Sequence, residues 1–153
     1  MPESTKISGL ETHLGYWLRF VSNHVSHAFS LKVEASGVTV AEWVVLRELY
    51  DRGSVVPSHL ADALGMTRGA ISKLADRLAA KGLVSKDTSR DDRRYQALSL
   101  TDAGKALVPQ LAALADENDT AFFGHLSAEE RVALEKTLRD IVRHQGLKSI
   151  PVE

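Results

Sequence analysis

The sequence predicts one domain of mainly α fold, with six helices and a small sheet of two or three strands. Apolar residues recur every three or four positions over most of the 153-residue chain, as in amphipathic helices. Two short runs, residues 83–87 and 95–100, instead alternate apolar and polar residues, as the strands of one hairpin would. With 44% hydrophobic residues, the chain is long enough to bury one core.

The composition excludes several classes of protein. The longest apolar runs are far too short to cross a bilayer, and the polar residues 1–5 lead into no export signal. There is no cysteine, which excludes thiol catalysis, disulfides and cysteine-bound zinc. We therefore expect a soluble cytoplasmic protein that does not contact a membrane.

The first two helices are predicted from periodicity and a cap. An apolar stripe runs through residues 7–31 and predicts a long first helix. The second helix begins after Thr39, since Glu42 lies three residues later and the two can form a capping box. This helix ends near residues 51–53, and the pair 55–56 is a short extended piece.

The centre of the chain has the signature of a helix-turn-helix. Pro57 fits the first position of a third helix, which Gly65 closes. Thr67 can cap a fourth helix over residues 68–80. Two helices joined by a three-residue turn with glycine form this motif, and the hairpin that follows makes it a winged version.

Two more helices complete the chain. Thr101 begins a fifth helix that extends to about residue 123, and Pro109 inside it is expected to bend it. Ser127 and Glu130 form a second capping box, which opens a sixth helix that extends to about residue 144.

Charge is unevenly distributed along the chain. The formal net charge is −1, but residues 66–105 include nine basic and five acidic side chains and therefore carry +4. A basic centre with acidic flanks indicates a localised surface that binds anions.

The fourth helix has two distinct faces. Ile71, Leu74, Ala75 and Leu78 recur at helical spacing and are expected to pack inward. A face of short or basic residues near a helix N-terminus can enter the major groove of DNA, although it can also be only a solvated surface. The opposite face consists of Arg68, Gly69, Ser72, Lys73, Asp76 and Arg77.

The hairpin tip, Arg90-Asp91-Asp92-Arg93-Arg94, is unusual because arginine adds nothing to turn formation. Asp92 can hold the guanidinium of Arg94 by a bidentate pair, while Arg90 and Arg93 contact phosphate or the minor groove. The alternative is a solvated turn whose charges neutralise one another.

The block from residue 59 to residue 104 resembles the winged helix-turn-helix of the multiple antibiotic resistance regulator (MarR) family. The telling segments are LADALGMT, ISKLADRLAAKGLV, DDRR and LSLTDAG. The resemblance implies a homodimeric repressor on pseudo-palindromic duplex DNA, relieved by a small ligand. It implies that the helix from Thr67 to Ala80 reads the major groove and that residues 92–94 enter the minor groove. Thiol-based sensing is excluded, because the chain has no cysteine.

The resemblance also implies an organisation within the single domain 1–153. Residues 38–101 would form the winged DNA-binding lobe, and residues 6–34 and 102–147 a helical dimerisation lobe. The flanking helices have more apolar surface than one small winged lobe needs, and two chains can bury it together. The alternative is that these helices cover their own domain.

A ligand pocket is the weaker prediction. Trp17, Trp43 and Arg47 could line a cavity for a small aromatic or anionic effector. Ordinary core aromatics explain the tryptophans equally well, and Arg47 could simply pair with Glu11 or Asp51.

Two alternative functions follow from the remaining features. His13, His24 and His27 on the first helix suggest a metal sensor, although surface or core histidines explain them as well. The winged unit could also bind an acidic protein partner. We find no phosphate-binding loop, nucleophile elbow or metal motif, so we expect neither an enzyme nor a cofactor.

Overall fold

The structure is a computed structural model, and it describes residues 6–88 and 96–148. Within these residues it confirms six α-helices and a small antiparallel sheet. The elements are η1 (Leu10–Thr12), α1 (Leu14–Glu34), α2 (Val40–Arg52), β1 (Ser54–Val55), α3 (Pro57–Leu64), α4 (Arg68–Ala80), β2 (Val84–Thr88), β3 (Gln96–Leu100), α5 (Asp102–Phe123) and α6 (Ala128–His144).

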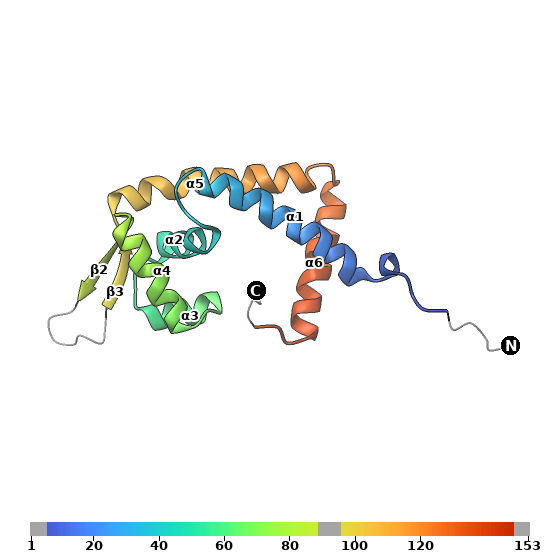
Figure 1. The fold of residues 1–153 in the computed structure, drawn as a ribbon, viewed down its shortest axis with the longest axis horizontal. Coiled ribbons are helices and arrows are strands. Elements are labelled where there is room, and N and C mark those ends of the chain that lie inside the picture. Colours follow the sequence, from blue (N-terminus) through green and yellow to red (C-terminus); the bar gives the residue numbers. More distant parts are fainter. Residues whose placement is uncertain (1–5, 89–95, 149–153) are drawn as a thin grey trace.

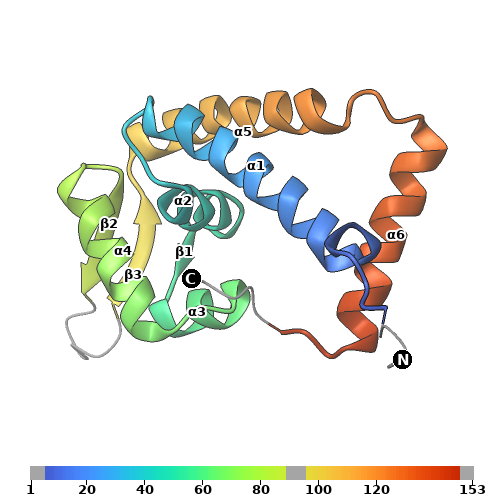
Figure 2. The ribbon, with the colours of Figure 1, turned by 45° about the vertical axis from the view of Figure 1, so that its right-hand side comes forward.

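The chain forms an arch (Figures 1 and 2). Helices α1 and α5 pack along each other and form the top of the arch. Helices α2, α3 and α4 and the sheet hang from one end, where α2 packs against both α4 and α5. Helix α6 descends from the other end.

The predicted start of the first helix is wrong. Residues 10–12 form a 3-10 turn, and His13 is extended, with φ −97° and ψ 127°, so that α1 begins only at Leu14. The indole Nε1 of Trp17 donates to the carbonyl of Glu11 at 2.9 Å and holds this turn against the helix. The stripe predicted continuous helix because periodicity does not reveal such local bonds. At its other end, α1 continues to Glu34.

The predicted caps are confirmed. In each case the hydroxyl of the cap accepts a backbone N–H three residues later at 3.1 Å. The caps are Thr39 on α2, Thr67 on α4, Thr101 on α5 and Ser127 on α6. Pro57 opens α3, and Gly65 closes it in the left-handed conformation, with φ 64°. These local bonds fix where the central helices begin.

The three-stranded sheet has the order β1-β3-β2, and both pairs are antiparallel. Val84 pairs with Leu100 and Thr88 with Gln96, which confirms the hairpin. The first strand is residues 54–55, and Val56, which is also extended with φ −74° and ψ 145°, is the N-cap of α3.

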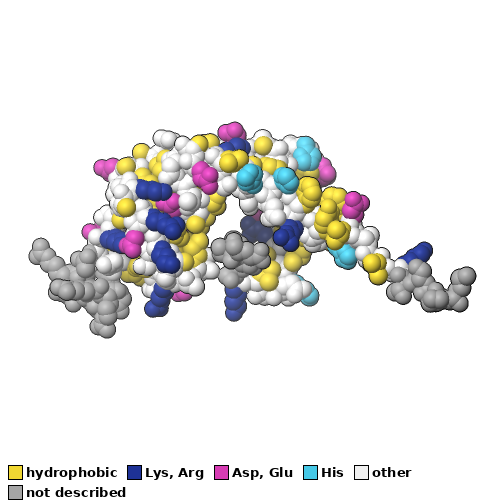
Figure 3. Space-filling view, in the orientation of Figure 1, with side chains coloured by type: hydrophobic (Ala, Val, Ile, Leu, Met, Phe, Trp, Pro, Cys, Tyr) yellow, Lys and Arg dark blue, Asp and Glu magenta, His cyan; other side chains and the backbone are white. Residues whose placement is uncertain are grey.

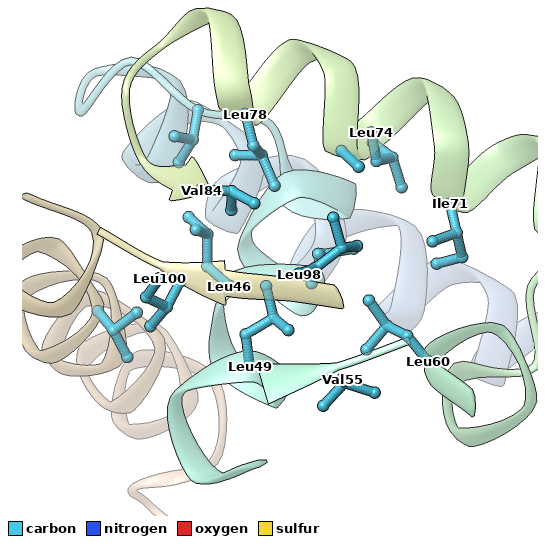
Figure 4. Close-up of a cluster of buried hydrophobic side chains, with 14 of the residues drawn as sticks. Leu46, Leu49, Val55, Leu60, Ile71, Leu74, Leu78, Val84, Leu98 and Leu100 are labelled. Atoms are coloured by element: carbon cyan, nitrogen blue, oxygen red, sulfur yellow. The ribbon is translucent and has the colours of Figure 1, made fainter. Parts of the chain in front are cut away.

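The core lies beneath α4. Ile71, Leu74 and Leu78 point from α4 toward buried residues of α2, α3 and the sheet (Figure 4). Together with Ala75, they are at most 7% exposed, as the sequence predicted. Burial of this face turns the opposite face of α4 outward.

Candidate nucleic-acid interface

The outward face of α4 contains every residue that the sequence placed there. Lys and Arg side chains gather on this lobe, over the position that α4 has in Figure 1 (Figure 3). A helix with one apolar and one polar face thus presents its polar face to solvent. The exposed residues are Thr67, Arg68, Gly69, Ser72, Lys73, Asp76 and Arg77.

The N-terminal end of α4 is suited to an anion. Its first turn has no acidic residue and begins with Arg68. The unpaired N–H groups and the helix dipole make such an end positive. Gly69 adds room, because a Cβ built there would meet nothing within 4 Å. The backbone of this turn is therefore open to close approach.

Asp76 lies on the same face but is already paired. Its carboxylate accepts a hydrogen bond from the ammonium of Lys86, which lies on β2. This ion pair connects α4 to the wing strand and neutralises one of the basic residues that gave the central segment its positive charge.

Lys81 is not part of the outward face either. Its ammonium lies 2.9 Å from Oε1 of Glu42, a carboxylate that is only 1% exposed. Burial raises the pKa of Glu42, but the bonds from Lys81 and Thr39 outweigh this and hold the pKa below its ordinary value. This partly buried ion pair was missed in the sequence, where Glu42 was assigned only a capping role.

The wing tip stays a prediction from sequence. Arg90, Asp92, Arg93 and Arg94 lie outside the described residues. The strands on either side, β2 and β3, are described and form the hairpin that was predicted.

The three predicted ligand residues do not all come together: Trp43 and Arg47 lie one turn apart on α2, whereas Trp17 lies far from them on α1. Trp43 packs edge-on against Phe29, with ring centroids 6.3 Å apart. Trp17 lies three turns earlier on α1 than Phe29, roughly 18 Å away along the helix. Arg47 pairs with Asp51 at 2.8 Å, so an ion pair within α2 accounts for this arginine.

An apolar groove lies instead between α1, the end of α5 and α6. Its volume is about 820 Å³. Its lining includes Trp17, Leu18, Val21, Phe122, Phe123, Leu134 and Leu138. Several of these side chains are strongly exposed for apolar residues, including Trp17 at 46% and Leu18 at 48%. The groove therefore leaves a large apolar surface uncovered in the single chain.

Helix α6 adds to this apolar surface. Each of its residues is exposed, although Leu134, Leu138, Ile141 and Val142 form an apolar stripe. An ion pair between Arg131 and Asp119, at 2.7 Å, links the start of the helix to α5. A helix whose apolar stripe faces solvent indicates a surface for association.

The three histidines of the first predicted helix have separate environments. His13 is the N-cap of α1, and the ring of His24 lies 5.0 Å from that of Phe20 in the groove. The carbonyl of His27 accepts a hydrogen bond from Ser30. Within residues 6–88 and 96–148, no three metal-binding side chains come together.

Comparisons with known proteins point to one family. A sequence profile of the MarR family matches residues 36–94. The transcriptional repressor MdtR of Bacillus subtilis is 31% identical over 114 residues, which are 67% of this chain and 74% of MdtR.

Solved structures of DNA-binding regulators are also similar to this chain. BpsR of Bordetella bronchiseptica, whose DNA binding is regulated by 6-hydroxynicotinic acid, is 27% identical, with a TM-score of 0.78. That match covers 88% of this chain and 98% of BpsR. A mutant of MarR from E. coli in complex with operator DNA is 25% identical, with a TM-score of 0.76, and the match covers 84% and 93% of the two chains.

None of the helices built from the described residues is long and apolar enough to span a membrane.

Proposed function

The chain belongs to the MarR family of transcription regulators, and from this premise we propose that it is a homodimeric repressor that binds a pseudo-palindromic duplex. One observation supports this most directly: the basic, glycine-containing face of α4 is fully turned to solvent beside the wing. The proposed repressor acts in the cytoplasm, where its DNA is.

In this proposal, α4 reads the major groove. Arg68, at the first position of the helix, reaches base edges, and Ser72 one turn later contacts a base or a phosphate. Gly69 allows the backbone to approach, and Thr67 orients the first turn. Lys73 and Arg77 lie further along the same face and bind the phosphate backbone.

The wing extends the contact to the minor groove. Arg90, Arg93 and Arg94 at its tip supply cations for this narrow, negative groove, and Asp92 orients Arg94. The ion pair of Asp76 with Lys86 supports the assignment, since it joins the two elements that have to bind together.

A second copy of the chain covers the apolar surfaces. We propose residues 38–101 as the DNA-binding lobe and residues 6–34 and 102–147 as the dimerisation lobe. The exposed apolar residues of α1 and α6 and the groove between them lie within these dimerisation ranges. Two copies related by a two-fold axis match the two half-sites of a pseudo-palindrome.

A small aromatic or anionic effector releases the complex. The relative MdtR is a repressor, and BpsR responds to an aromatic acid, which supports both the direction of regulation and the class of ligand.

The test begins with selection of bound fragments from the source genome by the purified full chain. We expect enrichment of a short inverted repeat, with two protein copies bound per repeat. A panel of aromatic carboxylic acids is then added to this complex, and at least one should release the DNA. Equal weak binding to all fragments would contradict the proposal and favour a winged module that binds an acidic protein.

A further inference from the structure

We propose that Lys81 is a positioning residue that holds α4 at the angle required to read DNA. It ties the C-terminal end of α4 to the junction between α1 and α2. This inference rests on the proposed function, because it concerns how α4 meets the duplex.

The contacts of Lys81 join parts of the chain that lie far apart in sequence. Its Nζ donates to Oε1 of Glu42 at 2.9 Å and to the carbonyl of Gly37 at 2.9 Å. Gly37 lies in the turn that follows α1, where its φ of 88° favours glycine. Glu42 belongs to the first turn of α2, and Lys81 is itself the C-cap of α4. One ammonium thus connects α4 to both helices.

The carboxylate acceptor of this connection is buried, and the side chain of Lys81 is 38% exposed. Glu42 is 1% exposed, and its Oε1 also accepts the backbone N–H of Thr39 at 3.1 Å. Among the described residues its Oε2 has no hydrogen-bond partner. A buried carboxylate is costly without a positive partner, so the ammonium of Lys81 is held in place.

The geometry makes this attachment important for recognition. The hydrophobic effect beneath α4 is non-directional, whereas hydrogen bonds have preferred directions. Those of Lys81 act at the C-terminal end of the helix, and the Lys86–Asp76 pair acts nearer its middle. Helix α4 has 13 residues and is roughly 20 Å long. A rotation of about 10° about Lys81 would move its N-terminal end by roughly 3 Å, close to the rise of one base pair. A small rotation of α4 at Lys81 therefore causes a large displacement of its N-terminal end at the DNA groove.

The same geometry argues against a phosphate contact by Lys81. It lies at the opposite end of α4 from Thr67 and Arg68, and two of its three donors are already used. Neutralising it should leave the salt dependence of DNA binding unchanged. Neutralising a phosphate contact would reduce the slope of log affinity against log salt by about 0.9.

The test uses variants that distinguish a change in the orientation of α4 from a loss of stability of the folded chain. Lys81→Met alone leaves a buried charge unpaired, so the main variant is the double substitution Lys81→Met with Glu42→Gln. Glutamine keeps the acceptor for Thr39. Glu42→Gln alone is a second variant that weakens the hold on Lys81 and keeps the cap. Lys81→Arg is the conservative variant, and Lys73→Met is the matched control on the outward face.

Two quantities are measured for each full-length variant: the urea unfolding midpoint, and affinity for duplexes whose half-sites are at the native spacing or one base pair closer or further apart. The double variant should unfold near the wild-type midpoint, bind the native duplex about tenfold more weakly and lose preference for native spacing. The slope of log affinity against log salt should be unchanged in the double variant. The Glu42→Gln variant should lose part of the preference for native half-site spacing, and the Lys81→Arg variant should retain this preference. Lys73→Met should lower the salt slope and keep the preference.

Wild-type spacing preference in the double variant or in Glu42→Gln would overturn the inference, as would a salt slope lowered by about 0.9 in the double variant. Absence of sequence-specific binding by the wild type would instead overturn the proposed function.

Discussion

At the scale of single residues, Glu42 links stability to pH. Burial raises its pKa, but the bonds from Lys81 and Thr39 outweigh burial, so the folded chain holds the pKa below the ordinary value of 4.5. The folded state thus favours the charged form. The resulting stabilisation is fully present above about pH 4.5 and is lost as pH falls through the lowered pKa.

We expect Glu42→Gln to reduce the free energy of unfolding at pH 7 by about 1–3 kcal/mol, because Lys81 loses a charged partner. The difference from wild type should narrow below pH 4.5, where Glu42 itself becomes neutral. Urea unfolding at pH 7 and at pH 3.5 measures both effects.

Glu130→Gln is the matched control for this prediction. Glu130 forms the same capping box on α6, and the bonds from Ser127 lower its pKa, but it is exposed. Its substitution should change stability much less at either pH. An equal effect of the two substitutions would show that capping, rather than the buried pair, accounts for the loss.

Two glycines give a second prediction at this scale. A Cβ on Gly104 would collide with the backbone carbonyl of Leu83, because the start of α5 lies against the start of β2. Gly104→Ala should reduce the free energy of unfolding by about 1–3 kcal/mol in unfolding experiments.

A Cβ at Gly69 would meet open space, so in Gly69→Ala the free energy of unfolding should stay equal or rise by up to about 1 kcal/mol while DNA affinity falls. Wild-type stability of the Gly104→Ala variant, or wild-type DNA affinity of the Gly69→Ala variant, would contradict these assignments.

Residues whose partners are local could be predicted from the sequence. Thr39, Thr67, Thr101 and Ser127 cap helices through backbone groups three residues away. The role of Lys81 could not be predicted, since its acceptors lie 44 and 39 positions away in the sequence. Only the packed fold brings them together.

At the scale of elements, α4 should determine base preference. Arg68→Ala and Ser72→Ala should each change affinity for duplexes altered at one or two base positions by about 1–3 kcal/mol, and leave other positions unaffected. A panel of single-base operator variants measures this. Uniform weakening across the panel would mean that these side chains contact only phosphate.

The wing gives a separate prediction. Arg94→Ala should lower affinity for the operator and reduce preference for A·T-rich flanks, since arginine favours narrow minor grooves. The thermal unfolding midpoint should stay unchanged. Wild-type affinity in this variant would refute the wing assignment and leave α4 as the sole reader.

Element boundaries followed the sequence where a cap or a breaker marks them. The stripe over residues 7–31 predicted one helix, but the chain makes a 3-10 turn before Leu14. Leu10 in this turn is 70% exposed, and the indole of Trp17 donates to the carbonyl of Glu11 beside it. Periodicity reports which residues are apolar, whereas local hydrogen bonds such as this one determine where the helix begins.

At the scale of the whole molecule, the apolar surface of α1 and α6 should hold two copies together. Leu138→Asp should convert the dimer to a monomer in sedimentation and abolish tight operator binding. In the single chain Leu138 is already 40% exposed, so the substitution does not disturb the core. Lys136→Asp, on the opposite side of α6, is the control and should remain dimeric. A dimeric Leu138→Asp variant would place the interface elsewhere.

The sequence predicted surplus apolar surface on the flanking helices but not the groove that these helices form. The groove is formed by α1, the end of α5 and α6, which are distant in sequence and meet only in the arch. The same distance explains the ligand prediction, because Trp17 and Trp43 looked equivalent in sequence yet lie in different places. Which helices face each other depends on long-range packing.

In the proposed complex, two copies of the chain bind one specific duplex through α4 and the wing. The most direct measurement is wild-type affinity for the selected operator and for a scrambled duplex across a salt series. We predict two copies per operator, a specific affinity at least about a thousandfold above that for the scrambled duplex, and log affinity that falls linearly with log salt. Equal affinity for both duplexes would show that the chain does not recognise a specific sequence.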